Sequence, residues 1–203
     1  PRWEWRWFGR RFEPAESRLA ALTPGAVQES SETYLLSGAG DNVKVRDALM
    51  DIKVLREVDA NGLEQWTPVM KAGFPLPAAE VAKVFAALRL DPPPLPRASY
   101  DLEQFIDELA VTSGRIRAID VQKRRVRYTV GGCMAELSDV VADGKATRTI
   151  AVESEDAAVE LARLGDVGHR DADVIQLLEQ AHGGPPRHGV PSHCQQTLAS
   201  HSR

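Results

Sequence analysis

The chain has 203 residues, of which 25 are lysine or arginine and 29 are aspartate or glutamate, so its formal net charge is −4. This charge provides no overall positive field to attract a nucleic acid duplex or an anionic membrane. No apolar run approaches the roughly 18 residues of a membrane-spanning helix, and the first residues do not resemble a signal peptide. We therefore expect a soluble, cytoplasmic protein.

The histidines are confined to the end of the chain. Residues 1–168 contain none, and the two cysteines, Cys133 and Cys194, form no Cys-x-x-Cys pair. All five histidines follow: His169, His182, His188, His193 and His201. Any chemistry carried out by residues 1–168 must therefore use groups other than imidazole.

Alternation of apolar and charged residues predicts strands in the first part of the chain. The tryptophans Trp3, Trp5 and Trp7 alternate with charged residues, which gives one aromatic face and one charged face. The Asn61-Gly62 pair predicts a hairpin turn. Further strands are predicted over residues 32–37 and 63–74, and residues 42–47 and 49–58 form either two strands or one long bent ribbon.

A helical pattern interrupts the strands over residues 77–110, where Val81, Val84 and Phe85 recur at helical spacing. Strands are then predicted over 115–121, 123–130, 134–141 and 147–153, with short helices over 156–164 and 171–181. The composition of 183–203 favours disorder. This order predicts an α+β protein whose sheet can close into a barrel.

Cations and carboxylates each gather on one face of the predicted strands. If these faces point outward, the sheet is simply solvated on one side. If they point inward, with helices over the apolar side, the buried charges must be paired or bind an ion. A polyanion held by cations, with a divalent metal held by carboxylates, would satisfy such an interior.

The order of these motifs resembles the CYTH superfamily, also called triphosphate tunnel metalloenzymes, over residues 2–164. The stretches that carry the resemblance are Glu4-Trp5-Arg6-Trp7-Phe8, Val43-Lys44-Val45-Arg46-Asp47, Asp51-Ile52-Lys53, Lys123-Arg124-Arg125-Val126-Arg127-Tyr128, Met134–Val140 and Ile150-Ala151-Val152-Glu153-Ser154-Glu155. The resemblance implies an eight-stranded antiparallel tunnel barrel over residues 1–164, with a helical insertion at about 77–110 and flanking helices. Residues 165–203 would form a C-terminal helix and a disordered tail.

The resemblance also implies roles for individual residues. The expected metal ligands, for Mg²⁺ or Mn²⁺, are Glu4, Glu136, Glu153 and Glu155. The expected phosphate ligands are Arg6, Lys44, Arg46, Lys53, Lys71, Arg125 and Arg127, with Lys53 and Glu153 as the catalytic residues. The implied activity is metal-dependent hydrolysis of a small triphosphate-bearing or polyphosphate substrate.

The first strand departs from the family pattern, because Arg6 and Phe8 replace its second glutamate and its lysine. Arg6 could take a phosphate where the family binds metal. The alternative therefore stays open that the domain is a non-catalytic polyphosphate- or nucleotide-binding regulatory module. A third alternative is an interaction protein with solvated charged faces. The sequence leaves the oligomeric state open, a homodimer included.

Overall fold

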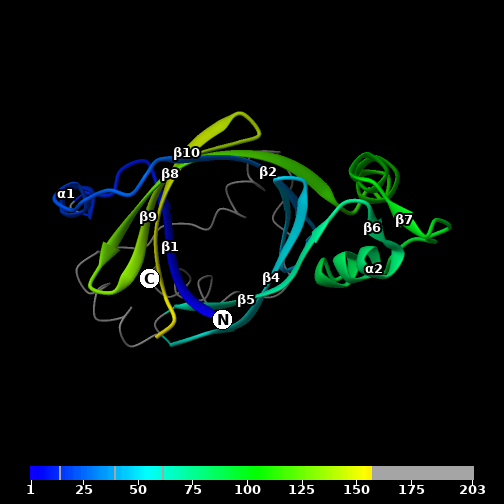
Figure 1. Ribbon diagram of the computed structural model, residues 1–203, viewed down its shortest axis with the longest axis horizontal. Coiled ribbons are helices and arrows are strands. Elements are labelled where there is room, and N and C mark those ends of the chain that lie inside the picture. The colour runs from blue at the N-terminus through cyan, green and yellow to red at the C-terminus, as the bar shows by residue number, and fades with distance from the viewer. Residues whose placement is uncertain (14, 39, 61, 157–203) are drawn as a thin grey trace, which may run out of the picture.

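Eight antiparallel strands close into a barrel in the computed structural model, which describes residues 1–13, 15–38, 40–60 and 62–156 (Figure 1). The strands are β1 (Arg2–Gly9), β2 (Gln28–Leu36), β3 (Asn42–Arg46), β4 (Leu49–Val58), β5 (Glu64–Gly73), β8 (Arg117–Val130), β9 (Cys133–Ala142) and β10 (Lys145–Ser154). Their order around the barrel is β1-β10-β9-β8-β2-β3-β4-β5. The predicted α+β fold with an eight-stranded antiparallel barrel, which the CYTH resemblance implies, is confirmed.

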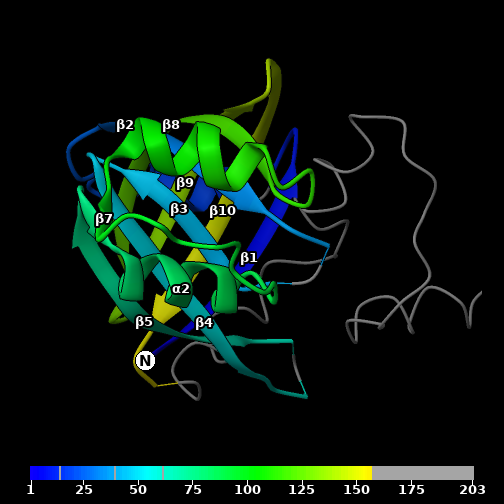
Figure 2. The same cartoon turned by 90° about the vertical axis from the view of Figure 1, so that its right-hand side faces the viewer.

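Helices lie on two opposite sides of the barrel (Figure 1). The short helix α1 (Ala15–Ala20) lies on one side. On the other lies an insertion made of β6 (Leu76–Pro77), α2 (Ala78–Ala87), β7 (Ser99–Tyr100) and the π-helix η1 (Gln104–Val111). Figure 2 shows this insertion in front of the barrel strands. None of the described helices is long and apolar enough to cross a membrane.

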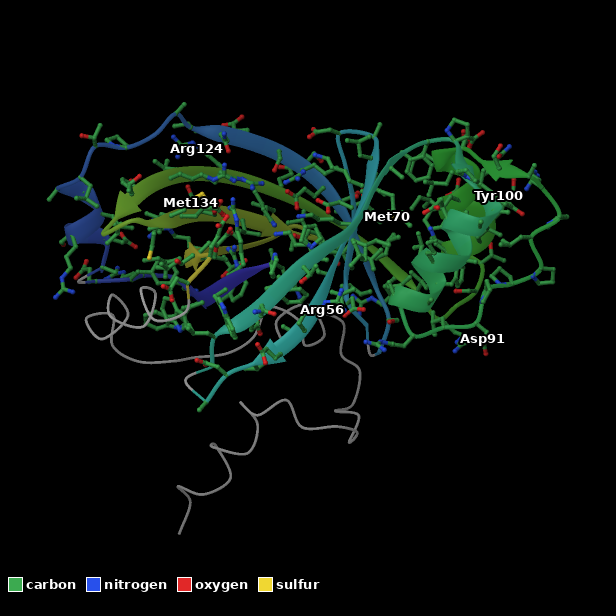
Figure 3. All side chains as sticks on the ribbon, turned by 60° about the horizontal axis from the view of Figure 1, so that its bottom comes forward. Arg56, Met70, Asp91, Tyr100, Arg124 and Met134 are labelled. Carbon is green, nitrogen blue, oxygen red and sulfur yellow. The ribbon has the colours of Figure 1, made fainter. Side chains whose placement is uncertain are left out.

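The apolar faces of the strands point outward and are covered by these helices. Ile52 of β4 and Phe85 of α2 belong to one buried cluster, and Trp5 and Trp7 of β1 pack in another with Phe12. Met70 of β5 lies where the barrel meets the insertion, as Figure 3 shows. Period-two alternation therefore sends the charged faces inward.

The interior of the barrel consequently holds polar side chains that are largely removed from solvent. The buried polar residues are Glu32, Lys44, Asp51, Arg125, Glu136, Ser138 and Thr149. A second group of inward residues is apolar and includes Ile119, Val121 and Val140. Of the two orientations left open by the sequence, the inward-facing one is present.

Two strands differ from the prediction. β2 begins at Gln28, four residues before the predicted start, because its polar first half pairs with the charged part of β8. β8 is a single strand from Arg117 to Val130, not two. The polar residues of both segments predict a loop or a break, but the pairing of β2 with β8 keeps them in the sheet.

β4 and β5 pair antiparallel on either side of the turn predicted at Asn61-Gly62. Asn61 lies outside the described residues, and Gly62 has a φ of 82°, which glycine adopts without strain. The segment between residues 42 and 58 forms two strands joined by a tight turn, in which Asp47 and Ala48 have φ of 53° and 55°. The predicted helices over 156–164 and 171–181, the domain end at 164 and the segment 165–203 lie outside the described residues.

Candidate functional site

A buried carboxylate inside the barrel gathers cations from the two strands, β3 and β8, that flank its own strand. Glu32 of β2 is fully buried, and its Oε2 accepts hydrogen bonds from Lys44 Nζ at 3.0 Å and Lys123 Nζ at 3.2 Å. Its Oε1 accepts from Arg125 Nη2 at 2.9 Å and lies 3.6 Å from Arg46 Nη1. We call these five residues the Glu32 cluster.

The charge of Glu32 is stabilised by its neighbours. Burial alone would raise the pKa of this carboxyl, but Lys123 and Lys44 outweigh burial and hold the pKa well below its ordinary value of 4.5. Burial in turn lowers the pKa of Lys123, against the attraction of Glu32. The hydroxyl of Tyr34 lies 2.7 Å from Lys123 Nζ and 3.4 Å from Lys44 Nζ.

A second carboxylate, Glu136 of β9, is surrounded in the same way. It accepts hydrogen bonds from Arg127 Nε at 3.3 Å and from Ser138 Oγ at 3.0 Å, and Arg6 and Arg125 each lie 3.9 Å away. Burial would raise the pKa of Glu136, yet Arg6 and Arg125 hold it below its ordinary value. Arg124, which directly precedes Arg125 on β8, points outward and instead lies near Asp139 on the surface.

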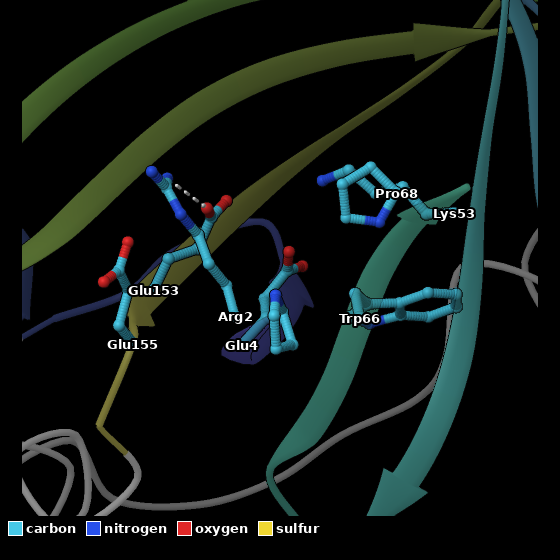
Figure 4. A pocket seen from close by; sticks show the side chains of 8 residues that line it. Arg2, Glu4, Lys53, Trp66, Pro68, Glu153 and Glu155 are labelled. Atoms are coloured by element: carbon cyan, nitrogen blue, oxygen red, sulfur yellow. Dashed lines mark ion pairs between the residues drawn. The ribbon is translucent and has the colours of Figure 1, made fainter. Parts of the chain in front are cut away.

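A cavity of about 340 Å³ lies beside β1, at the position where that strand pairs with both β10 and β5. Figure 4 shows Lys53, Trp66 and Pro68 on one side of it, and Arg2, Glu153 and Glu155 on the other. Arg2 Nη1 lies 3.6 Å from Glu153 Oε2. The residues that line the cavity are Pro1, Arg2, Glu4, Lys53, Trp66, Pro68, Glu153 and Glu155.

Three of the four predicted metal ligands line this cavity. Glu4 and Glu153 are direct partners across β1 and β10, and Glu155 follows the end of β10. Glu136 does not line the cavity and is held by arginines. Within the described ranges, no three Asp, Glu, His or Cys side chains form a ready-made metal cage. Mg²⁺ commonly binds to one or two carboxylates and completes its shell with water and phosphate oxygens, so Glu4 and Glu153 fit it.

The predicted phosphate ligands fall into separate places. Lys53 lines the cavity and makes no ion pair with the other described residues. Lys44, Arg46 and Arg125 belong to the Glu32 cluster, and Arg127 bonds Glu136. Lys71 is exposed and pairs in register with Asp51, which shares the inward face.

Sequence reasoning missed Glu32 and Trp66 as members of the site. Glu32 was placed at the first residue of a strand, whereas it lies in the middle of β2 and faces the cations. The sequence signal for Glu32 was its spacing of two from Tyr34, which places both side chains on one face of the strand. That face is the one that carries Lys44 and Arg46 on the neighbouring strand β3. Trp66 lies two residues before Pro68 on the inward face of β5, and the same alternation places it there.

No protein-family model and no curated protein matches this chain. The PH1012 protein from Pyrococcus horikoshii OT3 is 15% identical, with a TM-score of 0.44 over 79% of this chain and 82% of that chain. The HpAC1 protein from Hippeastrum, described with a dominant triphosphatase activity, is 11% identical, with a TM-score of 0.45 over 98% and 96%. The bh2851 protein from Bacillus halodurans is 11% identical, with a TM-score of 0.41 over 95% of each chain. These similarities concern backbone arrangement alone.

Proposed function

We propose that the barrel binds the phosphate groups of a triphosphate-bearing or polyphosphate substrate and hydrolyses a phosphoanhydride bond with Mg²⁺ or Mn²⁺. The observation that carries this proposal is the inward direction of the cations within a closed barrel. Lys123 and Arg125 point inside while Arg124, between them, points outside. Cations held in a water-poor interior bind phosphate oxygens strongly.

In this reaction the oxygen of a water molecule forms a bond to the terminal phosphorus while the bridging P–O bond breaks. The electron pair stays on the bridging oxygen of the leaving phosphate, and one proton of the water passes to solvent. Lys53 lies against the cavity, where its charge would stabilise the negative charge that develops on the phosphate oxygens. Mg²⁺ or Mn²⁺ held by Glu4 and Glu153 would neutralise phosphate charge and orient the attacking water.

A specific observation favours the second candidate, a non-catalytic binding module of the same fold. Arg6 Nε donates to Glu4 Oε1 at 2.6 Å, so one of the two carboxylates that fit a metal already has a cation beside it. The Glu32 cluster likewise supplies its own carboxylate to the cations. In both pairings a charged group that could bind metal or phosphate already has a partner within the protein. These pairings therefore favour binding of a ligand without rapid turnover.

Release of phosphate from tripolyphosphate and ATP with Mg²⁺ or Mn²⁺ tests the proposal. We expect Glu153→Ala and Lys53→Ala to abolish release. Glu80→Ala and Lys83→Ala are matched controls, because they remove the same charges from the surface of α2, where the two residues pair with each other. Both controls should keep the activity of the unmodified protein.

The outcomes separate the candidates. Equal activity in Glu153→Ala and the unmodified protein would overturn the catalytic role of Glu153. A rise in melting temperature with tripolyphosphate but no phosphate release would select the binding module, because a ligand that binds only the folded state stabilises it. If tripolyphosphate neither binds nor is hydrolysed, both candidates are wrong.

A further inference from the structure

Part of one cavity wall, beside Lys53, has no group that a phosphate could use. Trp66 and Pro68 follow each other at a spacing of two on β5, so both present apolar surface to the same side, next to Lys53 (Figure 4). Phosphate oxygens need hydrogen-bond donors or cations, and a proline ring offers neither. This wall therefore suits a part of the ligand other than its phosphates.

The ring of Trp66 is held in place without being part of the hydrophobic core. Its Nε1 donates a hydrogen bond to Glu64 Oε2 at 3.0 Å, and its backbone lies between partners on β1 and β4. Trp5 and Trp7 pack in the cluster with Phe12, whereas Trp66 belongs to none of the clusters formed by the described residues. Its one polar atom is already bonded, so the ring face serves only for stacking.

The opposite wall is ionic. Arg2, Glu153 and Glu155 lie across the cavity from Trp66, and the volume of about 340 Å³ falls in the range of small-ligand sites. A ligand that fills this space would place its charged end against Lys53 and the metal-binding carboxylates, and a flat apolar group against Trp66. Stacking of a base on an aromatic side chain contributes about 1–3 kcal/mol.

We propose that Trp66 is the stacking platform for a planar aromatic ring at the organic end of the substrate. The inference rests on the proposed function, since it takes the phosphates to be bound beside this wall. It narrows the substrate class to triphosphate esters that carry an aromatic ring, as nucleoside triphosphates do. Inorganic tripolyphosphate would bind without using Trp66.

The test compares ATP with tripolyphosphate, both with Mg²⁺, in the full chain and in the variants Trp66→Ala and Trp66→Phe. We expect Trp66→Ala to raise the Kd for ATP about 5- to 150-fold and to leave the Kd for tripolyphosphate within about twofold. Trp66→Phe should restore most of the affinity for ATP. Tryptophan fluorescence should be quenched by ATP in the unmodified protein and not in Trp66→Phe.

Three outcomes would overturn the inference. Equal weakening of both ligands in Trp66→Ala would make Trp66 a structural residue only. An unchanged Kd for ATP in Trp66→Ala, with tripolyphosphate still bound and hydrolysed, would leave the proposed function standing without an aromatic subsite. If the unmodified protein binds neither ATP nor tripolyphosphate, both the inference and the proposed function are wrong.

Discussion

Arg6 donates a hydrogen bond of 2.6 Å to Glu4, which lies two residues before it on the inward face of β1. The same guanidinium donates to Thr149 Oγ1 at 3.0 Å and lies 3.9 Å from Glu136. A cation therefore stands between two of the carboxylates that were expected to bind metal. Because like charges repel, Arg6 should weaken the binding of a divalent ion beside Glu4.

Removing this charge should strengthen metal binding. Arg6→Gln keeps a polar side chain but removes the cation, and we expect the affinity for Mn²⁺ to rise about tenfold. Calorimetric titration of the protein with Mn²⁺ measures the change. Arg148→Gln is the matched control, since it removes an arginine that pairs with Glu16 and Asp139 outside the barrel. The same Mn²⁺ affinity in both variants would show that Arg6 does not oppose the metal.

The Glu32 cluster should be a major source of stability. Glu32→Gln leaves Lys44, Lys123 and Arg125 in the interior without their shared carboxylate. Removal of one partner from a buried ion pair costs about 3–5 kcal/mol, so the free energy of unfolding in urea should fall by about this amount. Glu29→Gln, on the same strand but exposed, should change it by less than about 0.5 kcal/mol.

The same variant tests whether the cations can accept a ligand. Tripolyphosphate should raise the melting temperature of Glu32→Gln more than that of the unmodified protein, because its oxygens would take the place of the missing carboxylate. An equal rise in both proteins would mean that the Glu32 cluster is a structural element and that the substrate phosphates bind elsewhere in the barrel.

Much of the fold could be predicted because the strands alternate so regularly. The tryptophans of β1, the Asn61-Gly62 turn and the helical spacing of Val81 and Phe85 each led to an element that is present. Alternation alone could not show whether the charged faces point into the barrel or out to solvent. A sheet with a solvated charged face and a barrel with a charged interior have the same alternating pattern. The barrel closes through the pairing of β1 with β5, and helices cover the apolar outer face of its strands, which leaves the charged faces inside.

The site was less predictable, because its members were chosen one strand at a time. The sequence pattern indicated cations that are free to bind phosphate. In the structure Glu32 of β2 pairs with Lys44 of β3 and with Arg125 of β8. Such pairing depends on the register between neighbouring strands, which cannot be read from one strand at a time. Trp66 was overlooked for the same reason, since only its pairing with Arg2 places it beside Glu4.

The two larger hydrophobic clusters lie outside the barrel, under its helices, and a substitution in one of them should lower the free energy of unfolding. Phe85→Ala removes a fully buried ring from the cluster between α2 and the barrel strands. Loss of a buried phenylalanine costs about 3–5 kcal/mol, which urea unfolding would detect. Lys83→Ala on the exposed face of the same helix should change stability by less than about 0.5 kcal/mol. A loss below about 1 kcal/mol for Phe85→Ala would mean that the insertion adds little to the core.

Stability should depend on pH through the buried carboxylates. Burial would raise the pKa of Glu32, but Lys123 and Lys44 hold it below 4.5 in the folded state. A carboxyl with a lowered folded pKa contributes its full stability above its unfolded pKa and loses it as the pH falls toward the folded value. Urea unfolding between pH 7 and pH 3 should therefore show a steep loss below about pH 4.5 in the unmodified protein and in Glu29→Gln. Glu32→Gln should lose less over the same range, and parallel curves for the three proteins would contradict the lowered pKa of Glu32.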